Sequence, residues 1–129
     1  MKSSIKIKVR STQIDVMGHV NNATFLEYME WSREEWYKEA GVDFDSLKEK
    51  NLGTVIVNIN IDYLKEVVQD EILKVTTKPK TRGNKSYTLI HEIFNEREQL
   101  VAEAEATSVI INLNSRESIN LIPEIIDCF

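Results

Sequence analysis

Residues 15–22, with the sequence DVMGHVNN, hold an acid, a glycine, a histidine and two asparagines just ahead of a helical pattern. A carboxylate such as that of Asp15 can attack a carbonyl carbon, or activate a water molecule that attacks it. The N–H groups at a helix start have no partners and carry partial positive charge, so they can hold the oxyanion that forms. This turn therefore has the parts needed for acyl transfer to water.

The other residues of this turn fit either an active site or a purely structural turn. Gly18 would let the backbone approach a ligand or take a positive φ angle. Asn21 and Asn22 could donate amide hydrogen bonds or orient a water, and His19 could exchange protons or only hydrogen-bond the turn. Asp, Gly and Asn are also common in any strand-to-helix turn, and Asn22 is a candidate helix N-cap. The spacing alone leaves both interpretations open.

A second polar group is basic and surrounds the hairpin dipeptide Gly83-Asn84. Arginine suits bidentate contacts with phosphate and lysine suits a point-charge contact, so a phosphate-bearing ligand such as coenzyme A could bind there. Basic side chains can equally keep an edge strand from pairing with another protein. The cluster consists of Lys78, Lys80, Arg82 and Lys85.

These groups need a scaffold, and the hydrophobic pattern predicts one long helix and several strands. Helical spacing begins near Thr24, which forms a capping-box pattern with Glu27, and Gly41 suits the C-terminal cap. This helix is apolar around much of its circumference, so we expect another element to wrap it. A short helix is predicted for residues 43–50. Strand patterns cover residues 5–11, 54–64, 71–80, 86–94 and 100–113.

The order of these elements predicts an α+β fold in which a curved antiparallel five-stranded sheet wraps around one long central helix. In the strand 54–64, alternation places Val55, Val57, Ile59, Ile61 and Tyr63 on one face. His91 lies within a strand and is interpreted as a packed histidine. The last long strand carries small residues on one face, which would let a helix or a narrow ligand approach closely. They are Ala102, Ala104, Ala106 and Ser108.

Length and composition restrict the function classes. With 129 residues, we expect a single domain over residues 1–129. The net charge of −5 argues against general nucleic-acid binding, and no apolar run is long enough to span a bilayer. One cysteine, two histidines and no Cys-x-x-Cys leave neither an internal disulfide nor a recognisable metal site. Together with an N-terminus that lacks a signal-peptide centre, these features predict a cytoplasmic protein.

The motif of residues 15–22, followed by Phe25-Leu-Glu-Tyr28 and Arg33, resembles the signature of hot-dog-fold acyl-CoA thioesterases, in particular the 4-hydroxybenzoyl-CoA thioesterase-like group. Its His-Val-Asn-Asn segment is also similar to acyl-ACP thioesterases. The resemblance extends over nearly the whole chain. Tyr63-Leu-Lys-Glu66 is similar to the connection between the family's second and third strands, and Lys85-Ser86 to the start of its fourth strand.

By this resemblance, Asp15 is the catalytic acid, acting as nucleophile or general base, and the backbone N–H near Asn22 holds the thioester oxygen. Gly18 and Asn21 of that turn are expected to contact the substrate. Arg82 and Lys85, with Ser86 beside them, stand where related enzymes bind the nucleotide part of coenzyme A. The resemblance also implies a homodimer, often paired into a tetramer, with the active site between subunits. No cofactor is implied, because coenzyme A is part of the substrate.

The sequence departs from the family pattern at two places. Asn22 stands where one branch has a histidine, and His19 follows Asp15 by four residues rather than seven, so the role of that histidine does not transfer to either residue. Asp70-Glu71 stands where Gly-Asp is usual. The alternatives to an acyl-CoA thioesterase are a non-catalytic acyl-CoA or acyl-ACP binding protein and a hydratase or dehydratase. Phe25 and Met29 favour an apolar acyl chain.

Overall fold

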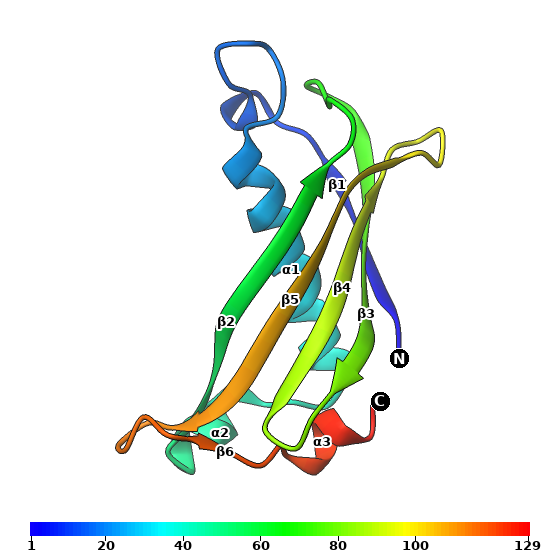
Figure 1. The fold of residues 1–129 in the computed structure, drawn as a ribbon. Coiled ribbons are helices and arrows are strands. Elements are labelled where there is room, and N and C mark those ends of the chain that lie inside the picture. The colour runs from blue at the N-terminus through cyan, green and yellow to red at the C-terminus, as the bar shows by residue number, and fades with distance from the viewer.

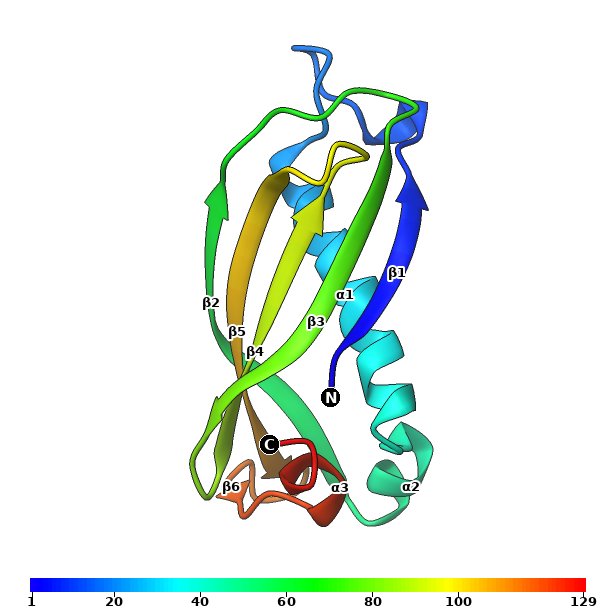
Figure 2. The ribbon, with the colours of Figure 1, turned by 90° about the vertical axis from the view of Figure 1, so that its right-hand side faces the viewer.

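A computed structural model describes residues 1–129 as a curved antiparallel sheet with a long helix, α1, packed on one of its faces (Figures 1 and 2). None of the helices combines the length and apolar character needed to cross a membrane. In chain order the elements are β1 (Ser3–Lys8), the 3-10 helix η1 (Ser11–Gln13), α1 (Asn22–Glu39), α2 (Phe44–Glu49), β2 (Leu52–Tyr63), β3 (Ile72–Arg82), β4 (Ser86–Phe94), β5 (Leu100–Asn112), β6 (Ser118–Ile119) and α3 (Pro123–Ile126).

The sheet has the strand order β1-β3-β4-β5-β2, and every pairing is antiparallel. The predicted architecture is confirmed, but the sheet has six strands rather than five, because β6 also pairs with β5. The Asn112 side chain explains the extra strand. Its Oδ1 accepts hydrogen bonds from the amides of Asn114 and Ser115, and this turn sends the chain back along β5.

The helix α1 begins at Asn22 because Asn21 is its N-cap. The Asn21 Oδ1 accepts a hydrogen bond from the Ala23 amide at 2.8 Å. The predicted capping box of Thr24 and Glu27 is wrong, since Thr24 already lies inside the helix. Asn22, the other candidate cap, is the first helical residue. At the far end, Ala40 caps the helix and Gly41 follows it with a φ angle of +79°.

One face of α1 packs on the sheet and the other is exposed. The buried face carries Phe25, Tyr28, Met29, Trp36 and Tyr37, along with smaller polar residues. The expectation that the helix is enclosed on most sides is therefore wrong for the single chain. The exposed face carries mostly charged side chains, which is compatible with water: Glu27, Glu30, Trp31, Glu34 and Lys38.

The strand β2 lies at the edge of the sheet and pairs only with β5. The register shifts between Ile56 and Asn58, so Val57 is an extra residue in β2 and reverses the alternation of faces. Paired residues of an antiparallel sheet share a face. Ile56 pairs with the buried Ser108, so Ile56 faces α1. The prediction that Val55 shares the face of Ile59 is wrong, because the bulge lies between them.

The core consists of two clusters along α1. The first surrounds the start of the helix, where Phe25, Tyr28 and Met29 pack with residues of β1, β3, β4 and β5. The second surrounds its end, where Trp36 and Tyr37 pack with β4, β5, α2 and α3. The predicted strip of small residues on β5 is buried, in keeping with the close approach expected there: Ala102, Ala104, Ala106 and Ser108. The first cluster fixes the position of the turn before α1.

Candidate functional site

The turn that precedes α1 is held closed by its own backbone. The Asp15 amide donates to the His19 carbonyl at 2.8 Å, and the Gly18 amide donates to the Asp15 carbonyl at 3.0 Å. Gly18 has a φ angle of +82°, which a glycine adopts without strain, as the sequence predicted. Val20 ties the turn to the loop after β2, because its amide donates to the Val67 carbonyl at 2.8 Å. The turn is therefore fixed at both of its ends.

The Asp15 carboxylate has one oxygen engaged in the turn and one free. Its Oδ1 accepts hydrogen bonds from the amides of Met17 and His19, at 2.9 and 3.3 Å. Its Oδ2 accepts no hydrogen bond within the chain, and no cation forms an ion pair with this carboxylate. Both interpretations left open by the sequence thus apply to Asp15: it builds the turn and still offers a free oxygen.

The start of α1 leaves one amide without a partner. The amides of Val20 and Asn21 donate to the carbonyls of Val67 and Gln13, and the Ala23 amide donates to asparagine side chains. The Asn22 amide has no hydrogen-bond acceptor in the chain. The Tyr63 hydroxyl donates to the Asn22 carbonyl at 3.0 Å and so holds this first residue of the helix in place. An unpaired N–H at a helix start is a donor for a negatively charged oxygen.

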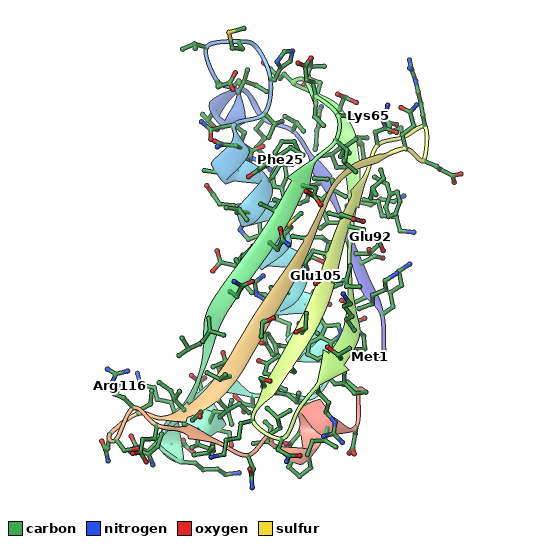
Figure 3. All side chains as sticks on the ribbon, in the orientation of Figure 1. Met1, Phe25, Lys65, Glu92, Glu105 and Arg116 are labelled. Atoms are coloured by element: carbon green, nitrogen blue, oxygen red, sulfur yellow. The ribbon has the colours of Figure 1, made fainter.

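These groups meet at an open pocket of about 730 Å³ between the turn, the start of α1 and the end of β2. Figure 3 places two of its lining residues, Phe25 and Lys65, at the same end of the molecule. The Phe25 ring packs edge-on against the Tyr63 ring and gives the pocket an apolar wall. The full lining is Asp15, His19, Val20, Asn22, Phe25, Tyr63, Leu64, Lys65 and Glu66.

His19 is turned toward Glu66 and not toward the Asp15 carboxylate. Its Nε2 lies 3.1 Å from the Glu66 Oε2. The only contact of His19 with the Asp15 carboxylate is through its backbone amide. Sequence reasoning missed Glu66 as a site residue. No local pattern predicts a contact between residues more than forty positions apart. The only clue in the sequence was the position of Glu66 in the Tyr63-Leu-Lys-Glu66 segment.

The β3–β4 hairpin, which carries the basic cluster, lies at the opposite end of the sheet from the turn before α1 (Figure 1), so a single chain does not bring the two groups together. Lys78 pairs with Glu92 at 3.0 Å, and Lys80 pairs with Glu105. Arg82 and Lys85 are exposed and form no ion pair, and Ser86 begins β4 as predicted. Two of the four cations are thus available to a ligand.

The chain matches known proteins over almost its whole length. The family profile of the thioesterase-like superfamily matches residues 9–128. The long-chain acyl-CoA thioesterase FadM of Escherichia coli K12 is 36% identical over 121 residues, which are 93% of this chain and 91% of FadM.

Two solved structures also align over almost the whole chain. The E. coli protein YbaW aligns with a TM-score of 0.82 and 33% identity, over 97% of this chain and 94% of YbaW. A 1,4-dihydroxy-2-naphthoyl-CoA thioesterase from Synechocystis aligns with a TM-score of 0.91 over 99% of this chain and 95% of that protein. At 19% identity, this second likeness concerns the fold alone.

Proposed function

The chain belongs to the thioesterase-like superfamily and is a hot-dog thioester hydrolase, and we propose that it hydrolyses acyl-CoA in the pocket beside Asp15. The observation that supports this site is the pair of unsatisfied groups that line one pocket, the Asp15 Oδ2 and the Asn22 amide. One is a base or nucleophile and the other is a donor for the carbonyl oxygen. The long-chain substrate of the relative FadM supports a long apolar acyl group, beginning against Phe25.

In the proposed reaction, the thioester carbonyl oxygen accepts a hydrogen bond from the Asn22 amide. The partial positive charge of the α1 start then stabilises the negative charge that develops on this oxygen during attack. Asp15 either takes the proton of an attacking water or attacks the carbonyl carbon itself. In the first route the attacking water becomes the second oxygen of the free acid as the carbon–sulfur bond breaks. In the second, breakage of the carbon–sulfur bond leaves a mixed anhydride between the acyl group and Asp15, and water hydrolyses it to release the acid and restore the carboxylate. In both routes coenzyme A leaves as the thiol.

We assign His19 a positioning role in this reaction. Its contact with Glu66 joins the catalytic turn to the connection after β2 and keeps the two walls of the pocket together. Gly18 and Asn21 act through the backbone, Gly18 by closing the turn and Asn21 by capping α1.

We further propose that the working unit is a homodimer joined through β2. No strand pairs with the outer edge of β2, and Val55, Val57 and Ile59 are exposed along it. Exposed apolar side chains on an unpaired edge strand favour association with another chain. Antiparallel pairing of two copies through β2 reverses one copy relative to the other. It would therefore carry the partner's Arg82 and Lys85 toward the Asp15 end, where they could hold the phosphates of coenzyme A.

A panel of acyl-CoA esters from acetyl to hexadecanoyl, followed with a thiol-detecting reagent, tests the proposed activity. We expect release of coenzyme A, fastest from the long apolar chains. Binding of the esters without release of thiol would favour a non-catalytic acyl-CoA binding protein. Hydration of an enoyl-CoA without thioester cleavage would favour a hydratase. An acyl-ACP of the same chain length, tested in parallel, reports the preferred carrier.

A further inference from the structure

A second pocket, of about 530 Å³, lies between the second half of α1, the following loop and the start of β2. Its apolar wall is formed by Val42, Phe44, Ile56 and the ring of Tyr37. The Tyr37 hydroxyl is turned away into a hydrogen bond with the buried Tyr87 hydroxyl. The charged lining residues are Glu30, Arg33, Glu34 and Lys38.

Arg33 differs from the other charged residues of this pocket because a chain of buried groups anchors it. Its Nη1 donates to the His91 Nε2 at 3.2 Å. A guanidinium has no acceptor, so the Nε2 is unprotonated and the Nδ1–H of His91 donates to the Thr77 Oγ1 at 2.9 Å. The Thr77 hydroxyl lies 2.7 Å from the Ser32 hydroxyl, which completes the chain. The packed histidine predicted from the sequence is therefore the support of this arginine.

The remaining donors of Arg33 are free. No carboxylate lies within ion-pair distance of its guanidinium, although Glu30 and Glu34 line the same pocket. A guanidinium has five N–H donors in a fixed plane, and one contact with His91 leaves the others for a ligand. The pocket thus combines an apolar wall with charged side chains, of which only the guanidinium of Arg33 is fixed by buried partners, and fixed donors of this kind can recognise a small oxygen-bearing group.

The inner face of β2 connects this pocket with the pocket at Asp15. Tyr63, Ile61 and Ile59 pair with buried alanines of β5, and Ile56 pairs with the buried Ser108, so all four face the same side as α1. Tyr63 lines the Asp15 pocket and Ile56 lines the second one. This row forms an apolar seam between the two pockets, and we call it the β2 seam.

The length of the seam sets the length of a ligand that reaches from one pocket to the other. Asn22 and Arg33 are separated by eleven helical steps, or about 16 Å along α1. An extended chain advances about 3.5 Å for every three bonds, so roughly fourteen bonds span this distance. An acyl group of about that length, with its thioester at Asn22, would place its far end at Arg33.

The charges of the pocket select among the possible end groups. The two acids and two cations that line the pocket sum to no net charge, so the pocket has no excess positive charge to offset the desolvation of a carboxylate end group. A neutral hydroxyl group accepts a hydrogen bond from Arg33 at a smaller desolvation cost. We propose that the second pocket binds the far end of a long acyl chain and that Arg33 selects chains with a terminal hydroxyl group. This inference rests on thioester hydrolysis at Asp15.

The test compares three substrates of equal length: tetradecanoyl-CoA, its ω-hydroxy derivative and its ω-carboxy derivative. For the wild-type protein we expect kcat/KM for the ω-hydroxy chain to exceed that for each of the other two by roughly 10-fold, the effect of one hydrogen bond to a charged group. Arg33→Met should remove this preference and retain hydrolysis of the plain chain. The matched control Arg97→Met changes an exposed arginine in the β4–β5 turn and should keep the preference.

Butyryl-CoA, which is too short to reach Arg33, separates this inference from the proposed function. Hydrolysis of butyryl-CoA with equal rates on the plain and ω-hydroxy chains would overturn the role of Arg33 and leave the activity at Asp15 intact. No hydrolysis of any ester would overturn both. Should Arg33→Met fail to fold, Ile56→Trp fills the same pocket, and we expect it to impair both long chains while butyryl-CoA is still hydrolysed. Unchanged rates on the long chains in folded Ile56→Trp protein would also contradict the inference.

Discussion

At the level of single residues, the proposed site gives Asp15 two separable roles, because its two carboxylate oxygens have different surroundings. The Oδ1 accepts the amides of Met17 and His19, and the Oδ2 is free beside the pocket. An asparagine can reproduce the first role, since its side-chain oxygen makes the same turn contacts. It cannot act as a base or a nucleophile. Substitution by asparagine therefore removes the chemistry and keeps the turn.

We expect Asp15→Asn to lower kcat for acyl-CoA hydrolysis by at least ~100-fold, the scale of a lost catalytic acid or base. Its midpoint of urea unfolding should remain close to that of the wild type. Asp15→Ala should lose the same activity and some stability as well, because it also removes the turn contacts. Asp45→Asn, an acid outside the pocket, serves as the control for a lost charge. Near-wild-type hydrolysis by folded Asp15→Asn protein would refute the assignment.

His91 makes a different prediction, about stability and pH. Burial, with a smaller effect of the Arg33 charge, lowers its pKa from 6.5 to about 3. Between these two pH values the unfolded chain binds more protons than the folded one. The contribution of His91 to the free energy of unfolding is therefore complete above pH 6.5 and falls as the pH decreases toward 3. At pH 4.5 this linkage amounts to about 3 kcal/mol. Urea unfolding at pH 7 and 4.5 should give a steeper pH dependence for wild type than for His91→Gln, and equal slopes would argue against a neutral buried histidine.

At the level of elements, the start of α1 shows where sequence reasoning succeeded and where it failed. The spacing of Phe25, Met29 and Trp36 correctly predicted the helix and its buried side. The choice of cap was wrong because Asn21, Asn22 and Thr24 are all good caps, and the decision rests on distant contacts. The Asn21 and Val20 amides bind carbonyls of η1 and of the loop after β2, which keeps the backbone extended until Asn21.

The cap predicts non-additive stability, because both asparagine side chains accept the Ala23 amide, at 2.8 and 3.0 Å. Asn21→Ala or Asn22→Ala alone leaves one acceptor in place, so each should cost about 0.5 kcal/mol, the low end for a lost cap. The double substitution should cost more than the sum of the two single ones. Urea unfolding of the four proteins measures this coupling. Strict additivity would mean that only one of the two side chains caps the helix.

The strand β2 shows a second limit of sequence patterns. Alternation predicted the strand itself, but the bulge at Val57 reverses the faces of the residues before it. The run of β-branched residues 55–57 gives no local signal of a bulge. The bulge is also what brings Ile56 to the side of α1 and into the pocket with Arg33. The same loss of information affects the contact between His19 and Glu66, which depends on the path of the whole chain.

At the level of the whole molecule, one chain divides the predicted site between its two ends. The turn before α1, which holds Asp15, lies at one end of the sheet, and the β3–β4 hairpin, which carries Arg82 and Lys85, lies at the other (Figure 1). The sequence predicted both groups of residues, but no local pattern gives the distance between them. The proposed antiparallel β2–β2 dimer would remove this separation, because each active site would then combine Asp15 of one subunit with the basic hairpin of the other.

Subunit mixing tests this arrangement. One variant carries Asp15→Asn, and the other carries both Arg82→Ala and Lys85→Ala, which should raise KM for acyl-CoA by weakening phosphate contacts. If the site is shared, each heterodimer regains one site with Asp15 and both cations. Refolding an equal mixture should then restore kcat/KM to about a quarter of wild type, since half of the dimers are mixed and each has one intact site. If each subunit uses its own hairpin, no intact site can form, and the mixture will show only the average of the two variants.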